Sequence, residues 1–189
     1  MMAKWVDMTP AALYERQRAL VRAGLLHAEP GRGPGSGVRA TPESVALLLI
    51  ALLTTGSLSE TESQTRKIAN LKSETERCPL TGKKSFASAL TAALASMDTA
   101  KQIRWLEVER GGAKASAAII YRPRGRERLV SVAVDLLSER DHPVESRFGF
   151  VGAGRKSQLS VRASLWLPFD AIAYGFQAES QGLIKEPEK

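Results

Sequence analysis

The residues of this chain that are best suited to specific chemistry are arginines near its start. Arg18 and Arg22 are four positions apart in the segment LYERQRALVRAG, so both project from one face if the segment is helical. A guanidinium group donates paired hydrogen bonds to a guanine edge or to a phosphate. Arg16 lies on the flank of this predicted helix, where it suits a phosphate contact. The pattern indicates recognition of an anionic partner.

Four further residues extend this candidate contact surface. Tyr14 and Glu15 lie on the outer side of the same predicted helix and would complete its contacts. Arg32 and Arg39 belong to the stretch HAEPGRGPGSGVRAT, whose glycines permit a close approach to a partner. Positive charge in such a loop favours contact with phosphates. The predicted site therefore combines a basic helix with a basic, glycine-rich loop.

Arrangements that could serve catalysis or metal binding are weaker. His142 and Ser146 lie in ERDHPVES, but proline and clustered charges are typical of an exposed turn rather than of a nucleophile beside a base. Cys78 is the only cysteine, so the chain forms no internal disulfide and supplies no paired thiolates to zinc. Residues 81–85 and 149–156 do not have the spacing of a phosphate-binding loop or of a dinucleotide fingerprint. We expect no enzyme activity, no metal and no cofactor, and a redox role for Cys78 stays open.

The composition fits a packed core with a basic surface. Hydrophobic residues make up 43% of the 189 residues, and the formal net charge is +7. A basic balance of this size favours an anionic partner, usually nucleic acid. The longest apolar run, residues 45–53, is about half of the ~20 residues that a membrane-spanning helix needs. No apolar segment of the kind found in secretory signals follows the first charged residues, so we expect a cytoplasmic protein without membrane contact.

Two helix starts are marked by Thr-Pro pairs. A threonine at the N-cap accepts a backbone N–H, and proline at the first helical position lacks a donor that would have no partner there. Thr9 and Thr41 each precede a proline, which predicts helices over residues 10–23 and 42–55, each followed by a glycine. The first helix is amphipathic, with a basic outer face. The second is apolar around nearly its whole circumference, so it is either the central helix of a small domain or part of a dimer interface.

The remainder of the chain predicts a mainly antiparallel sheet with helices. Residues 57–84 are polar and end in a loop with proline and glycine, which suggests a domain boundary. A helix of small residues is expected over 85–97 and a last helix over 168–181. Gly111 and Gly112 indicate a hairpin between the first two of four predicted strands. The strands are residues 102–109, 115–121, 128–136 and 159–167.

Aromatic residues of the second half are expected to anchor the core of this sheet rather than to stack on nucleic-acid bases. They are Trp105, Tyr121, Phe148, Phe150, Trp166 and Phe169.

The first part of the chain resembles a known family. A helix that ends in RAGLL, a loop of glycine and arginine, the restart GVRATPESV and a following apolar helix are similar to winged helix-turn-helix transcription regulators, most nearly those of the mercury-resistance regulator type. The resemblance covers about residues 4–58 and implies a homodimeric protein that binds double-stranded DNA sequence-specifically. It further implies that the recognition helix and the wing contribute the contacts. These residues are Tyr14, Arg16, Arg18 and Arg22 on the helix and Arg32 and Arg39 in the wing.

Together these patterns predict an α+β protein in three segments. Residues 1–58 would form the winged-helix DNA-binding domain, residues 59–84 a linker helix and loop, and residues 85–189 an α+β domain for dimerisation or for an effector or protein partner. The alternative is a phage or mobile-element accessory protein whose basic helix docks on an acidic protein partner. An enzyme built on the C-terminal sheet is the most distant hypothesis.

Overall fold

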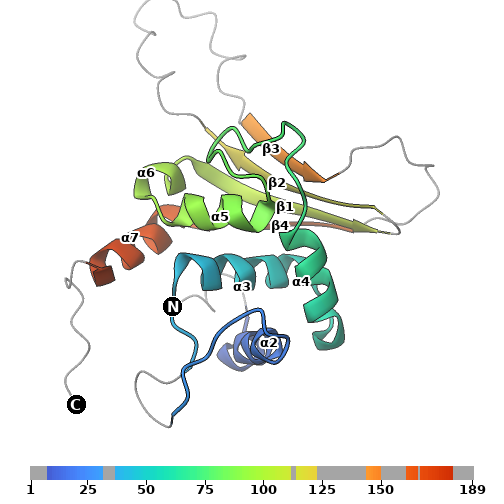
Figure 1. Cartoon of the computed structure of the whole chain (residues 1–189), viewed down its shortest axis with the longest axis vertical. Helices are drawn as coiled ribbons and strands as arrows, with labels where there is room; N and C mark the ends of the chain where they lie inside the picture. The colour runs from blue at the N-terminus through green and yellow to red at the C-terminus, as the bar shows by residue number, and fades with distance from the viewer. Residues whose placement is uncertain are drawn as a thin grey trace, which may run out of the picture.

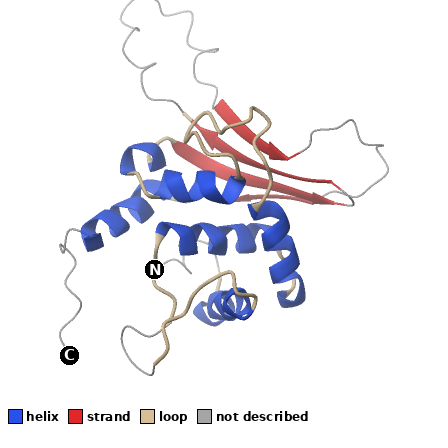
Figure 2. Ribbon diagram, viewed as in Figure 1, coloured by secondary structure: helices blue, strands red, loops and turns tan. Residues whose placement is uncertain are grey.

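Helices cover one face of an antiparallel sheet in this mixed α+β fold (Figures 1 and 2). The computed structural model describes residues 8–31, 37–111, 114–122, 144–149, 161–165 and 167–180. The α-helices of these residues are α2 (Pro10–Arg22), α3 (Pro42–Thr54), α4 (Thr61–Ala69), α5 (Phe86–Leu94), α6 (Met97–Ala100) and α7 (Phe169–Ser180), and a short 3-10 helix, η1 (Leu58–Glu60), precedes α4. The strands are β1 (Ile103–Gly111), β2 (Lys114–Tyr121), β3 (Val144–Gly149) and β4 (Val161–Leu165).

The four strands lie in the order β3-β2-β1-β4, and each neighbouring pair is antiparallel. The predicted hairpin is confirmed, because Gly111 pairs with Lys114 where β1 turns into β2. The strand predicted over residues 128–136 lies outside the described residues. The strand β3 was not predicted, and the expectation of an exposed turn is wrong for residues 144–146 because they pair with β2.

The register of the sheet aligns apolar residues on the face that the helices cover. Val108 of β1 pairs with Ala117 of β2, which pairs in turn with Phe148 of β3. All three are buried in the main hydrophobic cluster. The ring of Phe148 packs edge-on against Phe86 of α5, with ring centroids 5.2 Å apart. This contact joins the helical layer to the edge of the sheet.

The predicted aromatic anchors are confirmed in three cases. Tyr121, Phe148 and Phe169 are buried. Trp105 is only half-buried, and its indole N–H donates to a carboxylate oxygen of Glu107 at 3.2 Å. It therefore lies on the other face of the sheet from Phe148. Phe150 and Trp166 lie outside the described residues.

Helix α3 is the centre of the helical layer. It packs against α2, α4 and α5 and also against strands β1 and β4. Nine of its thirteen residues are buried, which explains why its sequence is apolar on all sides. The chain itself buries most of this helix, so its burial does not require a dimer interface, and it is central to the helical layer of the whole described fold.

One hydrophobic core runs through both halves of the described chain. Leu20 and Leu26 belong to the same cluster as Phe86, Leu106 and Phe169. The loop between α4 and α5 is attached to the sheet rather than extended from it, since the backbone N–H of Glu74 donates to the carbonyl of Arg147 at 3.1 Å. Residues 1–58 and 85–189, which were expected to form separate domains, thus share a core where the structure describes them.

A buried hydroxyl on α4 provides a test of this packing. Thr65 is fully buried, and its side-chain oxygen has no hydrogen-bond partner among the described residues. Valine has nearly the same shape and removes the cost of burying the hydroxyl, so Thr65→Val is expected to raise the free energy of unfolding by about 1 kcal/mol, measured by urea denaturation.

Thr55, at the end of α3, is the matched control. It is also buried, but its hydroxyl donates to the carbonyl of Ala51 at 2.6 Å. Thr55→Val is therefore expected to lower the free energy of unfolding by about 1 kcal/mol. Equal losses of stability for the two valine variants would contradict this account of Thr65.

Candidate nucleic-acid interface

Helix α2 begins and ends where local sequence signals predict. The side-chain oxygen of Thr9 accepts from the backbone N–H of Ala12 at 3.2 Å, and Pro10 occupies the first helical position. At the other end Gly24 has a φ of +67°, a left-handed conformation that glycine adopts without strain. The helix ends at Arg22, one residue before the predicted boundary. Its length and orientation are thus defined at both ends.

The inner side of α2 is fixed to the rest of the protein. Leu20 is fully buried in the core. From α4, the guanidinium of Arg66 donates to the carbonyl of Ala23 and also to Glu62, at 3.1 Å for the latter bond. Carbonyl groups at a helix C-terminus carry partial negative charge, which favours a cation there. Arg66 therefore links the end of α2 to α4 through a hydrogen bond.

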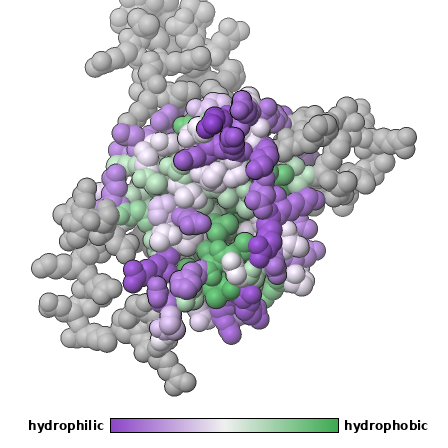
Figure 3. Space-filling view, in the orientation of Figure 1, coloured by the Kyte–Doolittle hydropathy of each residue, from purple (hydrophilic) through white to green (hydrophobic). Residues whose placement is uncertain are grey.

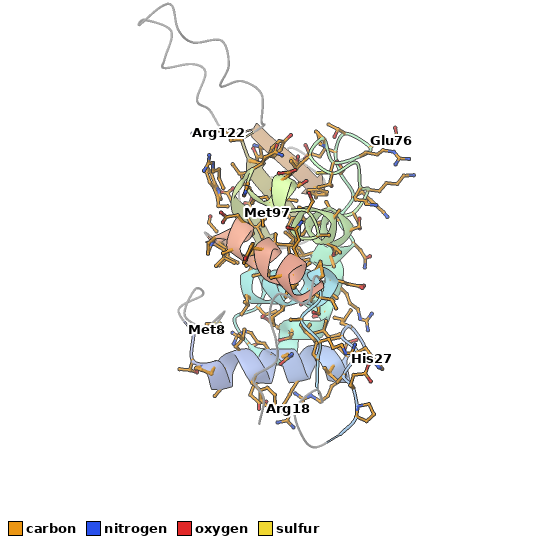
Figure 4. All side chains as sticks on the ribbon, turned by 90° about the vertical axis from the view of Figure 1, so that its left-hand side faces the viewer. Met8, Arg18, His27, Glu76, Met97 and Arg122 are labelled. Atoms are coloured by element: carbon orange, nitrogen blue, oxygen red, sulfur yellow. The ribbon has the colours of Figure 1, made fainter. Side chains whose placement is uncertain are left out.

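The outer side of α2 presents the predicted aromatic and basic residues to solvent. Tyr14 is 58% exposed, and Arg18 and Arg22 are also exposed. The Arg18 guanidinium lies 3.1 Å from a carboxylate oxygen of Glu15 and 5.9 Å from the centre of the Tyr14 ring. Figure 4 shows Arg18 on the side of α2 that faces away from the other helices. The amphipathic pattern with a basic outer face is confirmed.

Arg16 differs from the other arginines of this helix. It is half-buried, and its Nε atom is shielded from solvent without a hydrogen-bond partner among the described residues. Two residues before Arg18, it projects from nearly the opposite side of the helix. The structure therefore does not bring Arg16 together with Arg18 and Arg22.

The glycine-rich loop after α2 is closed at its base. Glu29 and Gly37 form an antiparallel bridge in which each backbone N–H donates to the other residue's carbonyl, at 2.9 and 3.0 Å. Gly37 has a φ of +102°, which only glycine adopts readily. The two ends of the loop are thus held together beside α2. Arg32, within the loop, lies outside the described residues.

Arg39 follows the bridge and joins the surface of α2. It lines a hollow of about 380 Å³ together with Tyr14 and Gln17. It also lines a second hollow, of about 370 Å³, together with His27 and Glu29. Arg39 is exposed, and the two hollows that it lines place it between α2 and the base of the loop.

The start of α3 fixes the position of Arg39. Thr41 and Ser44 cap this helix reciprocally, each side-chain oxygen accepting from the other residue's backbone N–H. The Ser44 hydroxyl also donates to the carbonyl of Arg39 at 2.7 Å. The predicted capping by Thr41 is confirmed, and it holds the chain that carries Arg39.

Gln17 and His27 contribute to this surface although the sequence did not single them out for it. Gln17 falls on the apolar side of the helix by periodicity, and the structure places it at the rim of that side, half-buried. His27 follows the last residue of the RAGLL segment and is exposed. Figure 4 shows His27 near the C-terminal end of α2. Helical periodicity applies only within a helix, so it could not predict the position of His27 beyond the end of α2.

The alternative sites do not assemble in the described part of the chain. Ser146 is buried, its hydroxyl has no hydrogen-bond partner among those residues, and His142 lies outside them. Glu145 and Arg147 on the same strand form an ion pair of 2.8 Å, which raises the pKa of the Arg147 guanidinium. Among the residues described, no group of His, Cys, Asp and Glu could hold a metal ion, and no helix is long and apolar enough to cross a membrane.

Comparison of the chain with protein-family models, curated proteins and solved structures gave no match.

Proposed function

We propose that this chain is a sequence-specific transcription regulator that binds double-stranded DNA as a homodimer. In this proposal α2 enters the major groove, and the loop closed by Glu29 and Gly37 acts as the wing of a winged-helix unit. The observation that carries the proposal is the exposure of Arg18 and Arg22 on the outer side of a helix whose inner side is anchored in the core.

The dimensions of α2 suit this role. The helix has 13 residues, and at 1.5 Å per residue it is about 20 Å long. The major groove of B-DNA, about 12 Å wide, admits a single helix. Arg18 and Arg22 are one turn apart, so they would address neighbouring positions along the groove. The anchoring of α2 by Leu20 and Arg66 would keep these side chains in a fixed orientation.

The charges on the helix favour a division of tasks among its arginines. Glu15 lies 3.1 Å from Arg18, and a carboxylate so close would be repelled by a phosphate. Arg18 is therefore better placed to contact base edges, where the Glu15 carboxylate could accept from a cytosine amino group. Arg22 and Arg39 form no ion pair with an acid in the part of the chain that the structure describes, so they suit phosphates on either side.

A second candidate function is docking on an acidic protein partner. The exposed Tyr14 ring beside the Arg18 guanidinium favours it, because tyrosine and arginine are enriched in the parts of protein interfaces that contribute most to affinity. Both functions would use the same outer side of α2, and only binding measurements separate them.

The test is a titration of the protein against random and genomic-promoter duplexes across a series of salt concentrations. We expect some promoter duplexes to bind about 10³-fold more tightly than random DNA, the lower end of the usual specificity range. Binding to all duplexes is expected to weaken steeply as salt rises, because phosphate contacts release counterions. Weak binding without preference among duplexes would overturn the proposal and favour the protein partner.

A further inference from the structure

A groove with small side chains lies between α3 and α5. The two helices run side by side in opposite directions (Figure 1). The groove has a volume of about 640 Å³. Its floor and walls include Leu47 of α3 and five small residues on and after α5. These are Ala87, Ser88, Thr91, Ala92 and Ala95. The face seen in Figure 3 carries a group of apolar residues over α3, with hydrophilic residues on both sides.

The two ends of this groove carry opposite charges. Glu43 lies in the first turn of α3, and Lys83 lies just before the start of α5. Because the helices are antiparallel, these two residues mark opposite ends of the groove. Both are exposed, and neither forms an ion pair with another residue that the structure describes. The groove therefore has an acidic end and a basic end, with small and apolar residues between them.

We propose that a second copy of this chain covers the groove, related by a two-fold axis that lies in the interface and crosses the centre of the groove at right angles. A two-fold interface uses the same patch on both copies, so the patch must complement itself. Rotation by 180° about this axis exchanges the two ends of the groove. Glu43 of one copy then meets Lys83 of the partner subunit, and Lys83 meets the partner's Glu43. A uniformly charged groove would repel itself in this arrangement, whereas this one attracts itself at both ends.

The side chains along α5 fit the close approach that such pairing requires. Ser88, Thr91, Ala92 and Ala95 recur at intervals of three and four, so they form one stripe along the helix. Short side chains let helix axes approach to the lower end of the usual range, about 8 Å. In the dimer, α5 of each copy therefore lies against α5 of the other, in the opposite direction, and the two copies of α3 face each other in the same way. The interface thus consists of two helix pairs stacked face to face, and the short side chains let the two copies of α5 come close.

The dimer deepens the proposed function and rests on it only for its biological purpose. A two-fold regulator reads two half-sites, and this interface supplies the symmetry axis. The surface of the groove shares no residue with the DNA contacts proposed for α2. The association is measured without DNA, so failure of the dimer and failure of DNA binding are seen separately.

The experiment reverses the charges at the two ends of the groove and measures molar mass by sedimentation equilibrium. Wild type is expected to be a dimer. Glu43→Lys places two lysines together at each end, and Lys83→Glu places two glutamates together there. Each variant alone is expected to dissociate at least about tenfold more readily. The exposed residues Glu60 and Lys101 provide matched controls, since Glu60→Lys and Lys101→Glu should leave the dimer unchanged.

Mixing the two single variants gives the decisive measurement. One chain then carries lysines at both ends and the other carries glutamates, so a heterodimer has two attractive contacts. We expect an equimolar mixture to recover the wild-type dimer affinity, a result that variants unable to fold could not give. A monomeric wild type, single variants that dimerise as wild type does, or a mixture that stays dissociated would each overturn the proposal.

Discussion

Phe148→Ala is expected to lower the free energy of unfolding by about 3–5 kcal/mol, the usual cost of removing a buried phenylalanine. Phe148 is fully buried at the point where β3, β2 and α5 meet. The variant loses the transfer free energy of the ring and leaves a cavity. It also loses the edge-on contact with Phe86, which in such pairs is worth about 0.5–1.5 kcal/mol beyond the buried area.

The position of Phe148 explains why its neighbours should not compensate. Its backbone pairs with Ala117 on one side and forms an isolated bridge with Ser73 of the α4–α5 loop on the other. The surrounding backbone is therefore held by hydrogen bonds and can close the cavity only by breaking them. Partial collapse of a cavity lowers the cost of a substitution, so a site held in this way should lie toward the upper end of the range.

Urea denaturation measures the effect, and an exposed aromatic residue provides the control. Tyr174 on α7 is one of the exposed large side chains, so Tyr174→Ala is expected to change stability by no more than about 0.5 kcal/mol. A double-mutant cycle with Phe86→Ala isolates the contact between the two rings. If Phe148→Ala cost no more than Tyr174→Ala, the attachment of β3 to the helical layer would be wrong.

Helix starts in this chain could be predicted because their signals are local. The Thr-Pro pairs at Thr9 and Thr41 place a capping side chain directly before a helix, and both caps form as expected. Gly24 likewise closes α2 in the left-handed conformation. Each of these features depends on atoms within a few residues, so the surrounding fold has little influence on it.

Strand β3 could not be predicted because its burial depends on distant residues. Its sequence VESRFG is short and half polar. Glu145 and Arg147 face outward, whereas Ser146 and Phe148 are buried by the helical layer. A six-residue alternation next to a proline and clustered charges is also typical of a turn. Only the pairing with β2 shows that these residues form a strand rather than a turn.

The candidate site likewise has one part that local sequence predicts and another that depends on distant residues. Helical periodicity correctly predicted that Tyr14, Arg18 and Arg22 share an exposed side of α2. The hydrogen bond from Arg66 to Ala23 joins residues 43 positions apart, so no local sequence pattern could predict it. Likewise, Arg39 and Tyr14 line the same hollow because the loop between them is closed by the bridge from Glu29 to Gly37. Local sequence patterns do not predict this closure.

Arg18→Ala combined with Arg22→Ala is expected to lower the affinity for a preferred duplex by about 100-fold or more. A good base contact by arginine is worth about 1–3 kcal/mol of discrimination, and a phosphate contact adds further affinity. Both side chains are exposed and project away from the core, so their removal should leave the fold intact. Fluorescence polarisation with labelled duplexes measures the affinity.

A control with the same loss of charge separates specific contacts from general attraction. Lys67 and Lys101 are exposed cations on α4 and after α6, away from the outer side of α2. The variant Lys67→Ala/Lys101→Ala removes two positive charges, as the arginine variant does. It should weaken binding to all duplexes slightly and keep the preference among them. If both double variants behaved alike, α2 would contribute only net charge, and its role as the reading helix would be rejected.

The salt dependence then assigns each arginine to a base or to a phosphate. Every phosphate contact contributes about 0.9 to the slope of log affinity against log salt concentration. Because Glu15 is paired with Arg18, we expect Arg18→Ala alone to abolish the preference among duplexes while the slope stays close to that of wild type. Arg22→Ala alone should reduce the slope by about one and keep the preference. The reverse assignment would mean that DNA binding separates Arg18 from Glu15 and turns it toward the backbone.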